Sequence, residues 1–234
     1  MDELAAFDPK MRIIEYMLED SANTPLINMT LTDFAEETAS ESMAPGGGSI
    51  SAYVGSLGAS LASMVANLSS HKKGWDSRWE EFSNWAEKAQ NYKNRLLLMV
   101  DEDTKSFNAI IDAMRLPKAT DEEKTARTEA IQTATKYAVE VPLKVMEITC
   151  ESFDVIKAMV EIGNPNSVTD AGVGALCARA AVNGAYLNVK VNISSLKDKS
   201  YVSETLAKAD DIVRFANEKE AEILKMVNEK MAVM

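Results

Sequence analysis

One aspartate occupies a position where the sequence predicts a buried apolar residue. Apolar residues recur at steps of three and four over 76–114, the pattern of a helix face that packs in a core. The step after Met99 falls on Asp103, and the pattern resumes at Phe107. A buried aspartate either has a partner that satisfies it or lines a cavity, where burial raises its pKa and suits it to proton transfer; periodicity leaves both open. The apolar positions are Trp79, Phe82, Trp85, Ala89, Tyr92, Leu96, Met99, Phe107, Ile110 and Met114.

Three glycines precede an uncharged segment, and this start of a helix could hold an anion or a heterocycle. Gly46, Gly47 and Gly48 open the segment APGGGSISAYVGSLGASLASMVANLSSHKKGW. The first N–H groups of a helix have no partners within it, and the helix dipole favours negative charge there. A run of three glycines is more often only a flexible connection, so the argument for a site depends on the buried helix that follows.

The other polar residues give weaker signals. SVTD has capping-box spacing from Ser167, so Asp170 is expected first of all at a helix start. His71 is the sole histidine and stands beside Lys72 and Lys73 at a polar helix end, where we expect it on the surface. One histidine excludes a multi-histidine metal site, and its expected surface position argues against a His-based triad. Neither GxGxxG nor GxxxxGK[ST] is present. We expect no metal site and no nucleotide-dependent chemistry.

The composition is typical of an acidic helical protein. A net charge of −11 and a pI near 4.7 argue against nucleic acid or an anionic membrane as partner. Cys150 and Cys177 lack a CxxC or histidine partner, so we expect buried free thiols in a reducing cytosol. The start MDELAAFDPK lacks the basic and apolar regions of a signal peptide, which supports a cytoplasmic location. Only ten glycines and six prolines occur among 234 residues, and no strand pattern is found, so the prediction is all-α.

Prolines, glycines and capping residues divide the chain into helices. Pro25 ends a short amphipathic helix over 8–20, and Thr30 caps a second short helix. Thr120 caps the helix that follows the turn RLPKATDEEK, and Pro142 is expected to bend that helix. No linker divides the chain, so we predict one antiparallel bundle of long helices with short N-terminal helices. Besides the uncharged segment, the long helices are expected over 76–114, from Thr120 to about 162, over 168–196 and over 202–231.

The uncharged segment and a later helix each carry a stripe of small residues. Large side chains cover the other face of the first segment, and a helix that is apolar all round is expected to be buried on all sides. The segment exceeds the ~20 residues that a bilayer needs, but its seven serines and its flanks argue against a membrane span. We expect the two stripes to pack face to face, within the chain or across a dimer axis. The small residues are Gly55, Ala59, Ala62 and Ala66, then Gly174, Ala178, Ala181, Ala185 and Asn188; the large ones are Ile50, Val54, Leu57, Leu61, Met64 or Val65, and Leu68.

Three motifs in a fixed order resemble a known family. The cyclodeaminase half of formiminotransferase-cyclodeaminase is similar to this chain in APGGGSISAYVGSLGASLASMVANL, in DEDTKSFNAIIDAMRLPK followed by EEK, and in GAYLNVKVN. The resemblance runs from about Thr30 to the C-terminus, and FDPKMRIIEYMLED resembles the segment that joins the two halves of the bifunctional enzymes. It implies a single helical domain over 1–234, with 1–28 as a joining-like extension and without the formiminotransferase half.

The resemblance implies a reaction and a site. Members of the family are all-helical bundles that form dimers, with the folate site in a cleft at the dimer interface. They convert 5-formiminotetrahydrofolate to 5,10-methenyltetrahydrofolate and ammonia in histidine degradation, and nothing beyond the folate substrate is implied as a cofactor. The family's proposed acid/base, the second aspartate of DED, is Asp103 here. The expected folate-binding residues are Gly46, Gly47, Gly48, Ser49, Lys72, Lys73 and Asp170, with the two lysines holding a polyglutamyl tail.

Two other functions stay open. Free-standing members of the family include methenyltetrahydrofolate cyclohydrolases, which would bind the same folate and could use Asp103. A non-catalytic helical oligomerisation module would explain the small-residue stripes but not Asp103. A homodimer or a larger assembly is expected in each case, and a formiminotransferase on a separate chain is a further partner to consider.

Overall fold

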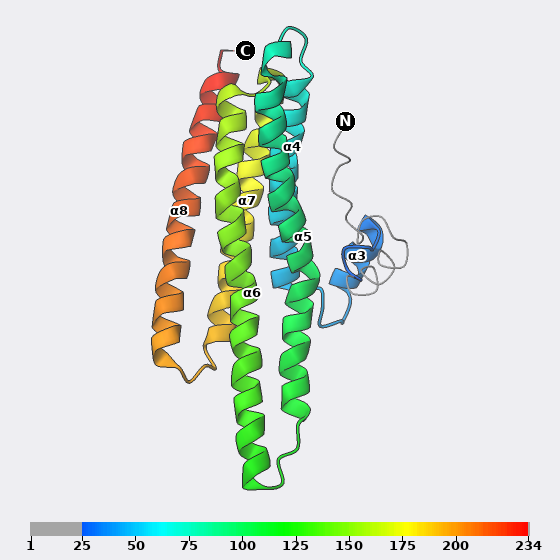
Figure 1. Cartoon of the computed structure of the whole chain (residues 1–234), viewed down its shortest axis with the longest axis vertical. Helices are drawn as coiled ribbons and strands as arrows, with labels where there is room; N and C mark the ends of the chain where they lie inside the picture. Colours follow the sequence, from blue (N-terminus) through cyan, green and yellow to red (C-terminus); the bar gives the residue numbers. More distant parts are fainter. Residues whose placement is uncertain (1–24, 234) are drawn as a thin grey trace, which may run out of the picture.

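The protein is an up-and-down bundle of long helices (Figure 1). The computed structural model describes residues 25–233. The helix expected over 8–20 and most of the extension expected over 1–28 lie outside these residues. Within 25–233 no strand occurs, which agrees with the all-α prediction. The helices are α3 (Leu31–Ala39), α4 (Gly47–Ser70), α5 (Trp79–Arg115), α6 (Asp121–Ile162), α7 (Val168–Ile193) and α8 (Lys199–Met231), with 3-10 turns at Asp76–Arg78 and Pro165–Ser167.

Side-chain caps set the starts of α3, α6 and α8. Thr120 and Glu123 form the predicted capping box of α6, in which the Glu123 N–H donates to the Thr120 hydroxyl at 3.2 Å. Thr30 caps α3 as predicted, through the Asp33 N–H at 3.1 Å. The capping role predicted for Ser167 is wrong, since its side chain makes no cap bond and a 3-10 turn leads directly into α7.

The two small-residue stripes pack against each other within one chain, as one of the predicted alternatives has it. A Cβ built on Gly58 would lie 2.9 Å from the carbonyl oxygen of Gly174, and a Cβ on Gly174 would lie 3.2 Å from that of Gly58. Only glycines allow the two backbones to approach this closely. The fully buried alanines along the contact are Ala59, Ala62 and Ala66 of α4 and Ala178, Ala181 and Ala185 of α7.

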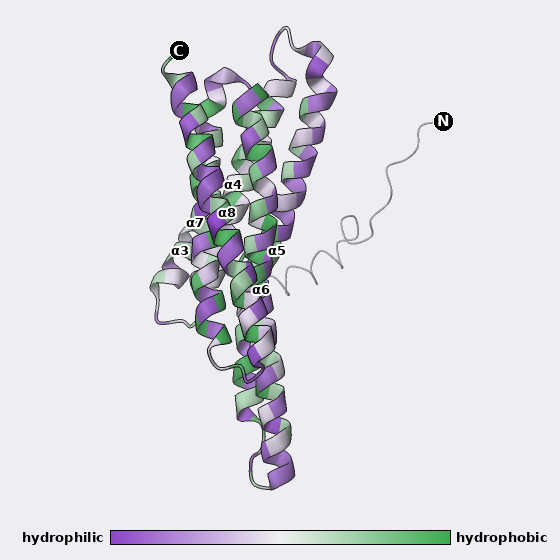
Figure 2. Ribbon diagram, turned by 90° about the vertical axis from the view of Figure 1, so that its left-hand side faces the viewer, coloured by the Kyte–Doolittle hydropathy of each residue, from purple (hydrophilic) through white to green (hydrophobic). Residues whose placement is uncertain are grey.

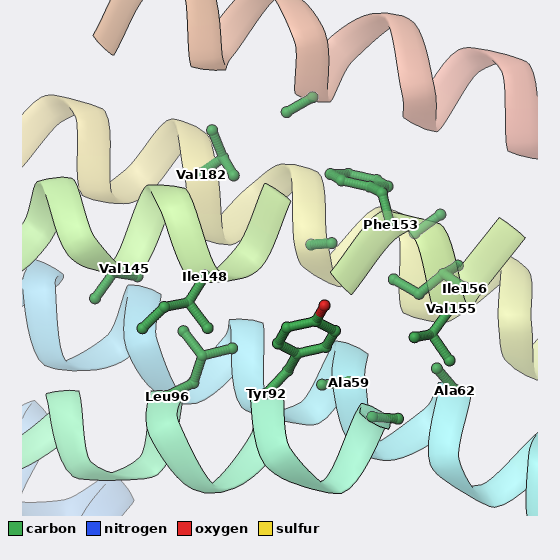
Figure 3. Packing of buried hydrophobic residues seen from close by; sticks show 14 of the residues in the cluster. Ala59, Ala62, Tyr92, Leu96, Val145, Ile148, Phe153, Val155, Ile156 and Val182 are labelled. Carbon is green, nitrogen blue, oxygen red and sulfur yellow. The ribbon is translucent and has the colours of Figure 1, made fainter. Parts of the chain in front are cut away.

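Large side chains from α5 and α6 fill the space beside these small residues. Figure 3 shows Leu96 of α5 directed toward Ile148 of α6, and Tyr92 of α5 with its ring beside Ala59 of α4. The central helix α4 therefore packs against α5, α6 and α7, and α8 covers α6 and α7. Because the side chains on the inner face of α4 are short, the neighbouring helices pack close to it. The side chains of those helices supply most of the apolar volume of the core.

The large-residue stripe of α4 corrects the expectation of burial on all sides. Leu57, Met64 and Leu68 are 41%, 37% and 46% exposed, because the small face of α4 points inward. The neighbouring helix α7 also exposes large apolar side chains, at Val173, Leu176, Leu187 and Val191. By length and composition alone α4 could cross a membrane, but it is the core helix of this bundle, and it does not indicate a membrane protein.

The lower parts of α5 and α6 form an arm that extends past the other helices (Figures 1 and 2). The apolar stripe predicted on α5 is buried in its middle, at Phe82, Ala89 and Leu96, and becomes exposed at its ends. Trp79 is 59% exposed and Met114 is 49% exposed, because fewer helices surround the ends of α5. Helix α6 runs without interruption through Pro142.

The two cysteines are free thiols, as predicted, but they are half-buried rather than buried. Burial raises the pKa of Cys150 to about 12 and also raises that of Cys177. Both therefore remain protonated and unreactive at neutral pH. His71 is exposed at the end of α4, as expected.

Candidate active site

A pocket of about 210 Å³ lies where the start of α4 meets α5, α6 and α7. It brings the glycine run and Asp103 together, although they are more than fifty residues apart in the sequence. Phe107 and Ile110 supply an apolar side at the base of the arm. The complete lining is Met43, Ala44, Gly46, Gly47, Gly48, Asp103, Thr104, Ser106, Phe107, Ile110, Ala138, Asn188 and Asn192.

The glycines allow the aspartate to approach the backbone of α4. Helix α4 starts at Gly47, and its N-cap residue Gly46 offers no side chain to the first turn. A Cβ on Gly48 would lie only 2.0 Å from Oδ1 and 2.6 Å from Oδ2 of Asp103. Any side chain at this position would displace the carboxyl group, so Gly48 is required by the site rather than by a turn.

Asp103 caps α4 with one carboxyl oxygen and leaves the other available. Its Oδ2 accepts hydrogen bonds from the Ser49 backbone N–H at 2.9 Å and from the Ser49 hydroxyl at 3.1 Å. No donor among the described residues reaches Oδ1. Burial raises the pKa of Asp103 above its usual value, and the two bonds from Ser49 lower it by less. A carboxyl group of this kind can give and take a proton near neutral pH.

The aspartate two positions before Asp103, Asp101, is a second buried carboxylate on α5. It is 2% exposed, and it accepts hydrogen bonds from the backbone N–H groups of Leu26 at 2.8 Å and Ile27 at 3.3 Å. The role of Asp101 is to anchor the segment before α3 to α5. Glu102 lies on another side of α5 and accepts a hydrogen bond from the Tyr137 hydroxyl.

Four polar side chains in the pocket were not predicted as site residues: Thr104, Ser106, Asn188 and Asn192. Asn188 and Asn192 lie one turn apart on α7, and Thr104 follows Asp103 on α5. Asn188 appeared in the sequence only as the end of the small-residue stripe. Its i, i+4 spacing to Asn192 within GAYLNVKVN is the signal that could have identified both asparagines, because that spacing places two amides on one helix face.

Comparison with known proteins assigns the chain to a family. A protein-family model described as Formiminotransferase-cyclodeaminase matches residues 30–211. The chain belongs to the formiminotransferase-cyclodeaminase family. This finding confirms the resemblance carried by the three sequence motifs, and residues 30–211 include the whole pocket.

Relatives within the family bear two different names. Formimidoyltransferase-cyclodeaminase of Rattus norvegicus is 34% identical over 225 residues, which are 96% of this chain and 42% of the relative. The chain therefore spans less than half the length of that relative. Methenyltetrahydrofolate cyclohydrolase of Methylorubrum extorquens is 36% identical over 204 residues, 87% of this chain and 98% of the relative. These names indicate a folate-processing enzyme.

A solved structure supports the fold of this family member. The crystal structure of formiminotetrahydrofolate cyclodeaminase from Thermotoga maritima matches with a TM-score of 0.76, covering 86% of this chain and 97% of the other. The two sequences are 23% identical in this comparison, so the likeness concerns the fold alone.

The other predicted site residues of this chain are Lys72, Lys73 and Asp170, and within one chain they lie away from the pocket. Lys72 and Lys73 follow the far end of α4, and a helix of 24 residues is about 36 Å long. The Lys72 ammonium lies over the ring of Trp75, 4.2 Å from its centroid. Asp170 lies in the first turn of α7, the end opposite Asn188. The structure thus brings together Gly46, Gly47, Gly48, Ser49 and Asp103. A folate-binding role stays a prediction for these residues of the α4 start as it does for Lys72, Lys73 and Asp170.

Proposed function

We propose that the chain is a formiminotetrahydrofolate cyclodeaminase, which converts 5-formiminotetrahydrofolate to 5,10-methenyltetrahydrofolate and ammonia in histidine degradation. The observation that carries the proposal is the Asp103 carboxyl group, which has a raised pKa, one available oxygen and a position in a pocket at a glycine helix start. The shared name of the family and the name of the rat relative support this reaction.

The reaction needs one group that can move a proton between two nitrogens. N10 of the folate attacks the formimino carbon and forms a bond to it, while N10 carries a proton that must be removed. The formimino group reacts as its protonated form, –CH=NH2⁺, so its exocyclic nitrogen needs one more proton after the attack. The bond from the carbon to that nitrogen then breaks, the nitrogen leaves as ammonia, and the positive charge remains on the methenyl product. Asp103 would take the first proton on Oδ1 and deliver it to the leaving nitrogen, so no net proton is gained or lost at the carboxyl group.

The size of the pocket supports a substrate that is only partly enclosed by one chain. Its volume of about 210 Å³ is below the ~300–1,000 Å³ of typical small-molecule sites. It suits the reactive end of a tetrahydrofolate rather than the whole molecule. The glutamyl tail would extend outside it, and the cations predicted to hold the tail are Lys72 and Lys73.

A second copy of the chain would complete the site. The exposed large residues of α4 and α7 give an apolar face along two packed helices, of the kind that commonly marks a protein interface. We expect a homodimer through this face, so Leu57→Glu and Leu176→Glu should give monomers by light scattering. Leu98→Glu, an equally exposed leucine on α5, is the control and should leave the mass unchanged.

Absorbance at the methenyltetrahydrofolate band, measured together with released ammonia, tests the proposed reaction. Wild-type protein and Asp103→Asn are compared after addition of 5-formiminotetrahydrofolate. We expect the band and ammonia from the wild type and a loss of ~10²–10⁴-fold in the variant, the usual contribution of a general acid/base. A folded wild type that produces neither signal would contradict the proposal.

A methenyltetrahydrofolate cyclohydrolase is the second candidate, and one observation favours it. The Methylorubrum extorquens relative with that name matches this chain over 98% of its own length. In this reaction Asp103 would activate the water that attacks the methenyl carbon. Loss of the methenyl band without a requirement for ammonia would identify this activity. Failure of both assays would leave the non-catalytic oligomerisation module.

The cellular setting remains part of the proposal. The free thiols and the acidic surface suit a cytoplasmic enzyme. The substrate would come from a formiminotransferase, which is expected on a separate chain or segment. No cofactor other than the folate is proposed.

A further inference from the structure

The polar part of the pocket opposite Asp103 consists of neutral side chains that can accept hydrogen bonds. They are Thr104, Ser106, Asn188 and Asn192, and no lysine or arginine is among the residues that line the pocket. Ser106 already donates its hydroxyl to the backbone carbonyl of Asp103 at 2.8 Å. Such a lining does not attract the anionic carboxylates of a folate. It suits a ligand group that is neutral or cationic and rich in N–H donors.

Contacts with the backbone orient both amides. Asn188 Nδ2 donates to the Gly184 carbonyl at 3.0 Å, and Asn192 Nδ2 donates to the Ala138 carbonyl at 2.7 Å. Because a carbonyl can only accept, each contact identifies the nitrogen end of the amide. Each Oδ1 is then left as an acceptor, and no donor within residues 25–233 reaches it.

The hydroxyl of Thr104 also lacks a partner. Its Oγ1 is buried without a hydrogen bond among the described residues. The Val100 carbonyl one turn earlier, a common acceptor for a helical threonine, already receives the Ser49 hydroxyl at 2.9 Å. A buried hydroxyl without a partner is costly, so a ligand or a water is expected to bind it.

Asn188 and Asp103 lie against successive residues of the glycine run. The Asn188 amide atoms are 3.4 and 3.8 Å from the position of a Cβ on Gly47, and the Asp103 carboxyl atoms are 2.0–2.6 Å from that of a Cβ on Gly48. Both side chains therefore adjoin the first turn of α4, from two successive positions.

We propose that Asn188, with Asn192 and Thr104, forms the subsite for the nitrogen that leaves as ammonia. The inference rests on the proposed deamination. The exocyclic nitrogen gains a third N–H and a localised positive charge before its bond to carbon breaks, so acceptors around it stabilise the transition state more than the bound substrate. Asp103 moves the proton, and the amide oxygens hold the N–H groups that result.

Inhibition by the product tests the subsite directly. The inhibition constant of ammonium chloride is measured during cyclisation of 5-formiminotetrahydrofolate, with sodium chloride as the salt control. For Asn188→Ala we expect a rise of about 10-fold in this constant and a fall of about 10–100-fold in kcat, the range for a hydrogen bond to a charged group. The Kd of tetrahydrofolate, which has no formimino group, should change less than about 2-fold because its ring does not use Asn188.

Two more variants keep the test independent of folding. Asn183→Ala is the matched control, because Asn183 makes the same bond to the carbonyl four residues earlier but lies outside the pocket. It should leave kcat and the ammonium constant unchanged. Thr104→Val removes the unpartnered hydroxyl, so it should preserve or raise Tm while it weakens ammonium inhibition.

The outcomes separate the inference from the function on which it rests. An active wild type whose ammonium constant does not change in Asn188→Ala would overturn the subsite alone. Equal losses in tetrahydrofolate binding and in kcat/KM, with kcat unchanged, would instead make Asn188 a ring-binding residue and also overturn it. A wild type without deamination would contradict the proposed function and the subsite with it.

Discussion

Asp101 and Asp103 stand two residues apart on α5, and both are largely removed from solvent, yet they differ in their surroundings. Both oxygens of Asp101 accept hydrogen bonds from backbone N–H groups of the segment before α3, and Asp101 does not line the pocket. Asp103 uses one oxygen to cap α4 and presents the other at the pocket. Burial therefore does not distinguish the two aspartates. An oxygen without a protein partner beside a pocket is the feature that makes Asp103 the proposed catalytic group.

The comparison also explains why one residue can serve structure and chemistry together. Oδ2 of Asp103 satisfies the first turn of α4, which has no capping side chain of its own. The same contact holds the carboxyl group in place, so Oδ1 has a defined position for proton transfer. Asp101 has no such division of roles, because its two oxygens make equivalent contacts.

The largest expected difference is in activity. Asp103→Asn should lose ~10²–10⁴-fold in kcat, because the amide cannot exchange a proton, while its oxygen can still accept from Ser49. Asp101→Asn should keep kcat within a few-fold per folded molecule, because Asp101 contacts only the segment before α3. Turnover normalised to the folded fraction measures both. Similar losses in the two variants would remove the distinction between the aspartates.

The next largest effect concerns Gly48, whose missing side chain leaves space for the Asp103 carboxyl group. Gly48→Ala should lower kcat/KM by ~10²-fold, because the new Cβ displaces the carboxyl group and a shift of about 1 Å in a catalytic group can have this effect. Gly46→Ala, at another residue of the pocket lining, should lower kcat/KM much less, because its Cβ would meet nothing closer than 3.8 Å. Steady-state kinetics of the two variants, with helicity checked by circular dichroism, makes the comparison, and equal behaviour would contradict it.

The anchoring role of Asp101 predicts a loss of stability. Asp101→Ala leaves the N–H groups of Leu26 and Ile27 without their acceptor, at a cost of roughly 1–3 kcal/mol for each buried group. Urea unfolding should therefore show a lower free energy of unfolding or an earlier transition of the segment before α3. Glu102→Ala, on another side of α5, should have a smaller effect because its contact is between side chains.

The smallest effect is the pH dependence of stability. Burial raises the folded-state pKa of Asp103 above its ordinary value of 3.8. Below pH 3.8 the Asp103 carboxyl is protonated in both the folded and the unfolded state. As pH rises through 3.8, the carboxyl ionises first in the unfolded state, so the free energy of unfolding of the wild type falls. Asp103→Asn has no such group, so its Tm relative to wild type should increase from pH 4 to pH 7. A relative Tm that falls over this range would contradict the raised pKa.

Much of the fold follows from local patterns. Thr30 and Thr120 cap helices as the sequence predicts, and α5 and α6 extend to within a few residues of their expected ends. The face-to-face contact of the small-residue stripes is also confirmed. These features depend on side chains close in sequence or on a repeat along a helix, and both are visible in one chain.

The rest depends on contacts between distant segments. Asp101 is covered by residues 26 and 27, so the periodicity of α5 alone cannot reveal its burial. The large residues of α4 are exposed because the small ones determine which face points inward. Asp103 could be found because it interrupts an apolar stripe, whereas Asn192 and Thr104 interrupt none.

Where α4 and α7 cross, at Gly58 and Gly174, there is no room for a larger side chain. A methyl group at Gly58 would meet the Gly174 backbone at 2.9 Å, and backbone cannot rotate away as a side chain does. The crossing lies well along α4 from Gly47, and the same two helices carry Ser49 and Asn188. In a saturation mutagenesis map, substitutions at Gly58 and Gly174 should therefore be depleted as strongly as those at pocket residues, although neither glycine lines the pocket.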